Sequence, residues 1–131
     1  MPFPSNTALI SIHGTNEDEP TLLHKPEWIL KLIFDDISSD EIDDYSGIGH
    51  YTLFNENTAR DISAFVDEYK DKAKAIICQC EYGQSRSAAV AAALLEYLYK
   101  GGIEIFADDR YYPNKLVFRL TLKALKSLTQ S

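Results

Sequence analysis

The sequence predicts an α/β fold, a three-layer sandwich whose mostly parallel central sheet is flanked by helices on both faces. Segments typical of buried strands alternate along the chain with segments of helical periodicity, and parallel strands need a crossover connection, usually a helix, between them. The 131 residues, 45% apolar and 25% charged, contain no repeat and no long linker. We therefore expect a single domain over residues 1–131 with one core.

Four short segments are predicted as strands because apolar and β-branched residues dominate them. The first is "TALISIH" at residues 7–13, the second is "WILKLIF" at 28–34, and the last is "KAIICQC" at 74–80. The run "YTLF" at 51–54 is a candidate for a short strand between them. Ligands of parallel sheets bind at the carboxyl ends of the strands, so functional residues are expected there.

Residues 55–74 are predicted to contain an amphipathic helix. Ile62, Phe65, Val66 and Tyr69 follow the i, i+3, i+4, i+7 spacing of one helical face. The asparagines at positions 55 and 57 are candidates for its N-cap.

Two more helices are expected after the last strand. Residues 85–100 are nearly all apolar, which predicts a helix buried on most sides, and two glycines end it. A final helix begins after Pro113 with Asn114 as its cap. We expect it to turn four apolar side chains toward the core: Val117, Leu120, Leu125 and Leu128.

The chain carries 20 acidic and 13 basic residues, a net charge of −7. This balance argues against general affinity for nucleic acid or for an anionic membrane, because both require a basic surface. Acidic residues gather in "NEDEP" and "DDISSDEIDD", which we interpret mainly as solvated loops.

The longest apolar run, residues 88–95, is far too short to span a bilayer. We expect a cytoplasmic, monomeric protein.

Cys78 and Cys80 are the two cysteines, and they stand one residue apart at the end of a predicted strand. Their spacing gives neither a disulfide framework nor a zinc site, and the three histidines are scattered, so no metal and no cofactor are expected. We expect Cys78 to pack in the core. The alternative, that it resolves an oxidised Cys80, strains the geometry, because residues two apart on a strand lie about 6.6 Å apart.

The junction "CEYGQSRS", residues 80–87, predicts an anion site. A strand that ends at Cys80, followed by a tight loop and a helix from about Ser85, directs backbone N–H groups and the positive end of the helix dipole at one point. The same field stabilises the thiolate form of Cys80. Arg86 offers a charged fork for two phosphate oxygens, and Gly83 permits the loop to turn. These parts suit a nucleophilic cysteine in a phosphate cradle.

This junction resembles the Cys-x5-Arg phosphate loop of the protein tyrosine phosphatase superfamily, and "GQSRS" is similar to its dual-specificity branch. Elsewhere "FDDIS" resembles the family's acid loop, "FNENTARDISAFVDEY" the helix before the catalytic strand, and "RYYPNKLVFRLTL" the final helix. The resemblance covers most of the chain from about Trp28. It implies a cysteine phosphatase-like fold and hydrolysis of phosphate monoesters, with a phosphorylated protein or a small phosphate monoester as the substrate.

The resemblance also implies a role for each matching residue. Cys80 would be the nucleophile, and Ser87 would donate a hydrogen bond to its sulfur. Asp36 or its neighbour Asp35 would be the general acid, and we prefer Asp36. The phosphate would be held by the loop residues Glu81, Tyr82, Gly83, Gln84, Ser85 and Arg86.

Two further positions are expected to support this loop. Asn114 matches a family position that buttresses it, and it is also a candidate for a plain helix cap. Gln79 departs from the family pattern, in which histidine usually precedes the nucleophile, but its amide can still offer a hydrogen bond. Two alternatives stay open: a catalytically weak phosphate-binding module, and another cysteine-loop enzyme such as a rhodanese-like sulfurtransferase or an arsenate reductase.

Overall fold

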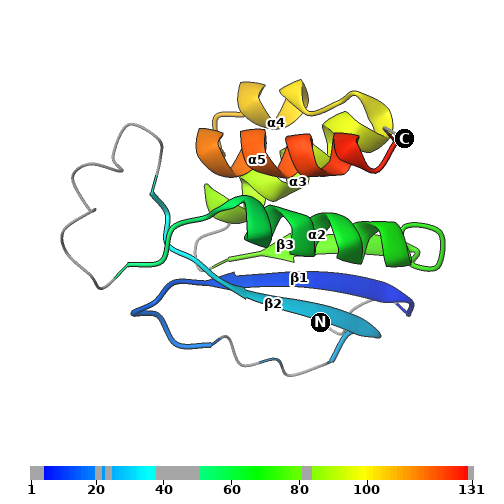
Figure 1. The fold of residues 1–131 in the computed structure, drawn as a ribbon, viewed down its shortest axis with the longest axis horizontal. Helices are drawn as coiled ribbons and strands as arrows, with labels where there is room; N and C mark the ends of the chain where they lie inside the picture. Colours follow the sequence, from blue (N-terminus) through cyan, green and yellow to red (C-terminus); the bar gives the residue numbers. More distant parts are fainter. Residues whose placement is uncertain (1–4, 20–21, 23–24, 38–50, 81–83, 130–131) are drawn as a thin grey trace.

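A computed structural model describes residues 5–19, 22, 25–37, 51–80 and 84–129. Within these ranges the chain forms three parallel strands, β1 (Thr7–His13), β2 (Trp28–Ile33) and β3 (Ala75–Gln79), in the order β2-β1-β3. The same ranges contain four helices, α2 (Glu56–Tyr69), α3 (Arg86–Tyr99), α4 (Ile103–Ala107) and α5 (Lys115–Ser127). The predicted α/β class with a parallel sheet is therefore confirmed (Figure 1).

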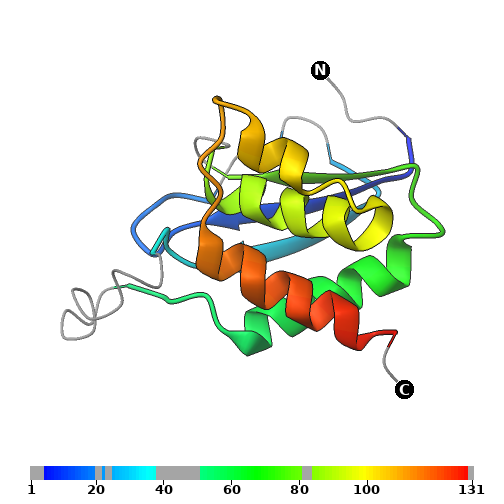
Figure 2. The same cartoon turned by 90° about the horizontal axis from the view of Figure 1, so that it is seen from above.

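The core lies between the sheet and the helices. Ala8, Ile10 and Ile12 alternate along β1 and belong to the buried cluster that the helices cover, because successive side chains of a strand point to opposite faces. Figures 1 and 2 show the described helices on one face of the sheet. On the opposite face Thr7 and Leu9 of β1 are also fully buried. A sandwich with helices on both faces stays a prediction.

Helix α2 forms as its periodicity predicts. Asn55 is the N-cap, with its side chain accepting a hydrogen bond from the backbone N–H of Thr58. Ile62, Phe65 and Val66 are buried against the sheet and α5. The helix ends at Tyr69, whose ring stacks on Trp28 of β2 with the ring centroids 4.9 Å apart.

Helices α3 and α5 pack against each other above the sheet (Figure 1). The first nine positions of α3 are almost all buried, and the helix ends at Tyr99, followed by its C-cap Lys100 in the left-handed conformation (φ 58°). Asn114 caps α5 as predicted, and Val117 and Leu125 are fully buried. The expectation for Leu128 was wrong: it is 38% exposed, because it follows the last turn of the helix.

Residues 51–54 do not form a strand, so that prediction was wrong. Among the described residues, the Asp35 N–H after β2 donates to the Thr52 carbonyl of this segment, and no strand ladder forms there. Phe54 is held by its ring, which meets Phe34 edge to face at 4.8 Å. The five-residue helix α4 was not predicted, and none of its residues is buried. In the described part of the chain no helix has the length and apolar content needed to cross a bilayer.

Candidate active site

The three strands end at the same edge of the sheet, because they are parallel and paired in register. Gly14 and Glu17 follow β1, Asp35 and Asp36 follow β2, and Cys80 follows β3. Helix α3 begins at this edge as well (Figure 1). The predicted catalytic residues Cys80, Asp36, Arg86 and Ser87 are thus supplied by segments that meet here.

Cys80 lies against the first turn of α3. Its sulfur is 3.1 Å from the hydroxyl oxygen of Ser87 and 3.5 Å from the backbone nitrogen of the same residue. The N-cap residue, Ser85, makes no capping bond with its own side chain, so it does not satisfy the first backbone N–H groups of the helix. A thiolate at Cys80 would therefore receive two hydrogen bonds and the positive end of the helix dipole.

Arg86 is only 6% exposed, and its guanidinium is clamped by a carboxylate. Nη1 donates to Glu17 Oε1 at 2.7 Å and Nη2 donates to Glu17 Oε2 at 3.2 Å. Nη1 also donates to the Phe34 carbonyl at 3.1 Å. Burial opposes the charged form, but the hydrogen bond and charge of Glu17 outweigh it and raise the pKa of Arg86.

Part of the guanidinium stays available. Arginine has five N–H donors, and the bonds to Glu17 and Phe34 use three of them. The other two are Nε–H and the second hydrogen of Nη2, which point the same way along one edge of the planar group. In the described residues no partner reaches this edge, so Arg86 keeps one fork for two oxygens of an anion.

Asp36 joins the start of α3 to the start of α5. Its Oδ1 accepts hydrogen bonds from the Ser85 hydroxyl at 2.7 Å and from Asn114 Nδ2 at 2.8 Å. Asn114, which is 5% exposed, also donates to the Ile37 carbonyl at 3.1 Å and caps α5 through its own oxygen. Within the described ranges no hydrogen bond reaches Asp36 Oδ2, so this oxygen is left for another partner.

Asp35 is bound more fully than its neighbour. Oδ1 accepts from the Thr15 N–H at 3.0 Å, and Oδ2 accepts from the Thr15 hydroxyl at 2.7 Å and the Thr52 N–H at 2.6 Å. Burial alone would raise the pKa of Asp35, but these hydrogen bonds and the charge of Arg86 together lower it. A carboxyl group held ionised in this way is a poor proton donor.

The described part of the predicted phosphate loop rests on the segment before α5. The Tyr112 N–H donates to the Gln84 carbonyl at 2.7 Å, and the Asn114 N–H donates to the Ser85 carbonyl at 3.2 Å. Asn114 therefore contacts the loop through its backbone and reaches Asp36 through its side chain. Three predicted members of the loop, Glu81, Tyr82 and Gly83, lie outside the described residues.

Gln79 lies on β3, and its amide is already engaged. Nε2 donates to the hydroxyl of Ser11, its register partner on β1, at 3.1 Å. Its described contact therefore links β3 to β1, one residue before Cys80.

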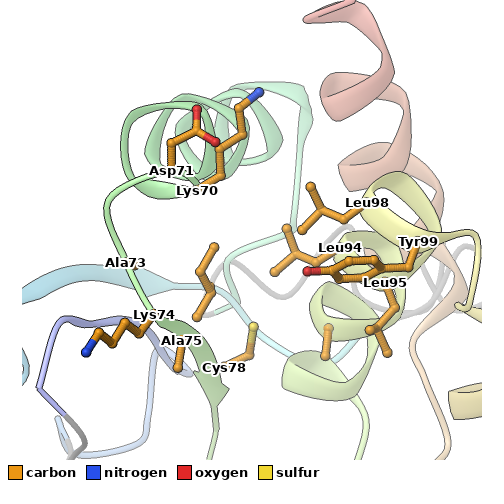
Figure 3. A pocket seen from close by; sticks show the side chains of 12 residues that line it. Lys70, Asp71, Ala73, Lys74, Ala75, Cys78, Leu94, Leu95, Leu98 and Tyr99 are labelled. Carbon is orange, nitrogen blue, oxygen red and sulfur yellow. The ribbon is translucent and has the colours of Figure 1, made fainter.

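Cys78 packs against the core cluster, as predicted, and so does Cys80. Cys78 also lines a groove of about 600 Å³ between β3 and α3, together with Leu94, Leu95 and other residues (Figure 3). Burial raises the pKa of Cys78 to about 12, and the nearby Cys80 contributes in the same direction. Both cysteines are free thiols. A neutral thiol with this pKa is a poor resolving nucleophile, which argues against that role for Cys78.

Glu17, Thr15 and Gly14 were not predicted as site residues. The acidic segment that contains Glu17 was interpreted mainly as a solvated loop, yet Glu17 is the direct partner of Arg86 across 69 positions of sequence. A signal for it existed: the segment follows a buried parallel strand, and such strand ends converge on the ligand edge of the sheet. In the described residues no cluster of three or more histidine, cysteine or acidic side chains is arranged to hold a metal ion.

Comparison with known proteins adds no relative from which a function could be transferred. No protein-family model, no curated protein and no solved structure matches this chain. The function must therefore be argued from the geometry and from the residues themselves.

Proposed function

We propose that this protein is a cysteine-dependent phosphatase of the tyrosine or dual-specificity type, which hydrolyses phosphate monoesters through a phosphocysteine intermediate. The observation that carries the proposal is the position of the Cys80 sulfur, which lies 3.1 Å from the Ser87 hydroxyl at the start of α3. Ser87 directly follows Arg86 in this helix. A nucleophile, a stabilised leaving thiolate and a cationic fork then act on the same phosphate.

In the first step the Cys80 thiolate attacks phosphorus, a sulfur–phosphorus bond forms, and the bond from phosphorus to the ester oxygen breaks. Arg86 and the backbone N–H groups at the start of α3 stabilise the charge that spreads over the equatorial oxygens. The leaving oxygen takes a proton from Asp36. In the second step Asp36 accepts a proton from water, which attacks phosphorus and releases phosphate and the thiolate.

The hydrogen bonds support Asp36 over Asp35 as the acid. Asp36 keeps Oδ2 without a partner in the described residues, whereas both oxygens of Asp35 accept hydrogen bonds. Asp36 is also tied to Ser85, which directly precedes Arg86. Ser87 would serve the second step, because a hydrogen bond to sulfur stabilises the thiolate as it leaves.

The substrate class follows from this chemistry. We propose a phosphorylated protein or a small phosphate monoester as the substrate, and a reducing compartment such as the cytoplasm, because the reaction requires a free thiolate. The proposed fold is that of the cysteine phosphatases. A phosphate-binding module without turnover is the main competing function, and the unusual Gln79 motivates it.

The deciding experiment is turnover of an aryl phosphate by the wild-type protein, Cys80→Ser and the matched control Cys78→Ser. We expect hydrolysis by the wild type and by the control, and loss of at least 90% of it in Cys80→Ser, because a serine hydroxyl in this field is not ionised. An acid-quenched protein should carry phosphate on Cys80. Phosphate binding without turnover would favour the binding module, and turnover of thiosulfate or arsenate instead would favour the other cysteine-loop enzymes.

A further inference from the structure

Glu17 lies beside the proposed reaction without taking part in it. We propose that Glu17 is a positioning residue: its carboxylate fixes the guanidinium of Arg86 so that the free fork faces the substrate phosphate. The inference rests on the proposed function, because it concerns the same site. Glu17 would act only through Arg86 and would not touch the phosphate.

The geometry of the contact determines the orientation of the guanidinium. Two parallel hydrogen bonds, at 2.7 and 3.2 Å, fix the plane of the group, and the bond from Nη1 to the Phe34 carbonyl fixes its tilt. Glu17 is itself held, because the Gly14 N–H donates to the same Oε1. The consequence is a single orientation of the remaining edge of Arg86.

Gly14 permits this arrangement by lacking a side chain. A Cβ atom at this position would lie 2.6 Å from Glu17 Oε1, 2.6 Å from Asp35 Oδ1 and 3.3 Å from Arg86 Nη1. The backbone, two carboxylates and a guanidinium therefore pack closely at the end of β1. Such close packing restricts each charged group to one position.

A buried guanidinium needs this support before the substrate arrives. Arg86 is 6% exposed, and an unpaired charge at such a site is strongly destabilising. Catalytic groups that are already oriented need no reorganisation when charge develops on the phosphate. Glu17 therefore compensates the charge of Arg86 on one edge and leaves the other edge ready.

The sign of the effect separates positioning from plain electrostatics. Glu17 is a negative charge near an anion site, and Arg86 lowers its pKa, so it is ionised at neutral pH. If its charge alone mattered, its removal would strengthen phosphate binding a few-fold, because one repulsion would vanish. Positioning predicts the opposite, a weaker phosphate complex after Glu17 is neutralised.

The experiment measures binding of inorganic phosphate through protection of Cys80 from iodoacetamide. Half-protection of Cys80 should require about tenfold more phosphate in Glu17→Gln than in the wild type. The same variant should lower kcat/KM for an aryl phosphate by about 10 to 100-fold. Glu17→Asp retains the charge but withdraws the carboxylate by one methylene group, and it should show a smaller loss of the same sign. This second variant keeps the test valid if Glu17→Gln does not fold.

The matched control is Glu19→Gln. Glu19 belongs to the same acidic segment, but it is half exposed and pairs with Lys31 on the surface. Its replacement removes the same charge without touching Arg86, so phosphate protection and turnover should stay within about twofold of the wild type.

A double-mutant cycle with Arg86→Lys tests whether Glu17 acts through the guanidinium. Lysine has no fork to orient, so Glu17→Gln should cause no further loss of phosphate affinity in the Arg86→Lys background. Equal loss in both backgrounds, or phosphate binding by Glu17→Gln as tight as in the wild type, would overturn the positioning role.

Wild-type protein that is protected by phosphate but has no turnover would overturn the phosphatase function alone. Wild-type protein without any protection would overturn both.

Discussion

The hydroxyl oxygen of Ser87 lies 3.1 Å from the sulfur of Cys80, although the loop that joins β3 to α3 separates the two residues in sequence. Ser87 is 3% exposed, so its hydroxyl has little access to solvent and its orientation is fixed by this contact. A hydroxyl so placed stabilises negative charge on sulfur. In the proposed reaction that charge is present before attack and appears again when the phosphocysteine breaks down.

We expect Ser87→Ala to lower kcat by about 10 to 100-fold with a smaller change in the first, phosphorylating step, because the poorer leaving thiolate slows the second step. The measurement is rapid-mixing hydrolysis of 4-nitrophenyl phosphate, in which the variant should release a burst of nitrophenol followed by a slow steady state. Ser63→Ala, which removes a buried hydroxyl from α2, is the control and should behave like the wild type. A variant without a burst and with unchanged kcat would contradict this role of Ser87.

Asp36→Asn should lower kcat by about 100-fold, in line with the usual contribution of a general acid. The loss should be larger for phenyl phosphate than for 4-nitrophenyl phosphate, because a poor leaving group depends more on protonation. Asp35→Asn should instead lower thermal stability, since three hydrogen bonds to the carboxylate are disturbed, at a cost of about 1–3 kcal/mol. If the leaving-group dependence follows Asp35, the assignment of the two residues is reversed, and if it follows neither, the acid lies elsewhere.

Acid should destabilise the protein through Glu17 and Asp35. Both have a pKa in the folded state below the ordinary values of 4.5 and 3.8, so their contribution to stability is complete above those values and is lost as the pH falls through the lower, folded-state pKa. The measurement is the midpoint of urea unfolding between about pH 6 and pH 2, in about 0.5 M salt to screen surface ion pairs. This midpoint should decrease as the pH is lowered. In the double variant Glu17→Gln/Asp35→Asn the midpoint should depend less steeply on pH. An equally steep dependence would show that Glu17 and Asp35 do not cause the loss of stability in acid.

Local sequence signals predicted most of the elements. Asn55 and Asn114 cap the helices that they precede, and the spacing of Ile62, Phe65 and Val66 identifies the buried face of α2. These features depend on residues within a few positions of one another, where periodicity and capping are informative. The run at residues 51–54 failed because a short apolar run does not distinguish a strand from a buried loop.

Contacts between distant segments were less predictable. The motif at residues 80–87 indicated Cys80, Arg86 and Ser87 because its parts are adjacent in sequence. Glu17 binds Arg86 from 69 positions away, through a loop whose path no local pattern encodes. Its acidic neighbours are exposed, so composition alone favoured a solvated loop.

Asn114 combines two functions that variants can separate. Asn114→Ser keeps a capping side chain for α5 but loses the amide that donates to Asp36 and Ile37, whereas Asn114→Ala loses both. We expect both variants to lower kcat similarly, because Asp36 loses the same partner in each. Asn114→Ala should unfold at a lower temperature, by about 1 kcal/mol of additional destabilisation. Equal melting temperatures would show that the cap contributes little, and unchanged kcat would show that Asp36 needs no support.

Gly14→Ala should disturb the proposed active site without changing any charge. The added Cβ would lie 2.6 Å from carboxylate oxygens of both Glu17 and Asp35, and neither group can move without losing hydrogen bonds. We expect a loss of stability of about 1–3 kcal/mol, as for other overpacked sites, and a fall in kcat/KM of about tenfold.

Gly101→Ala is the matched control, because a Cβ there meets no atom within 4 Å, and it should leave both quantities unchanged. Thermal melting and aryl phosphate kinetics on the two variants provide the comparison. If Gly14→Ala behaves like Gly101→Ala in both measurements, the carboxylates at the end of β1 are free to shift, and their positions do not govern Arg86.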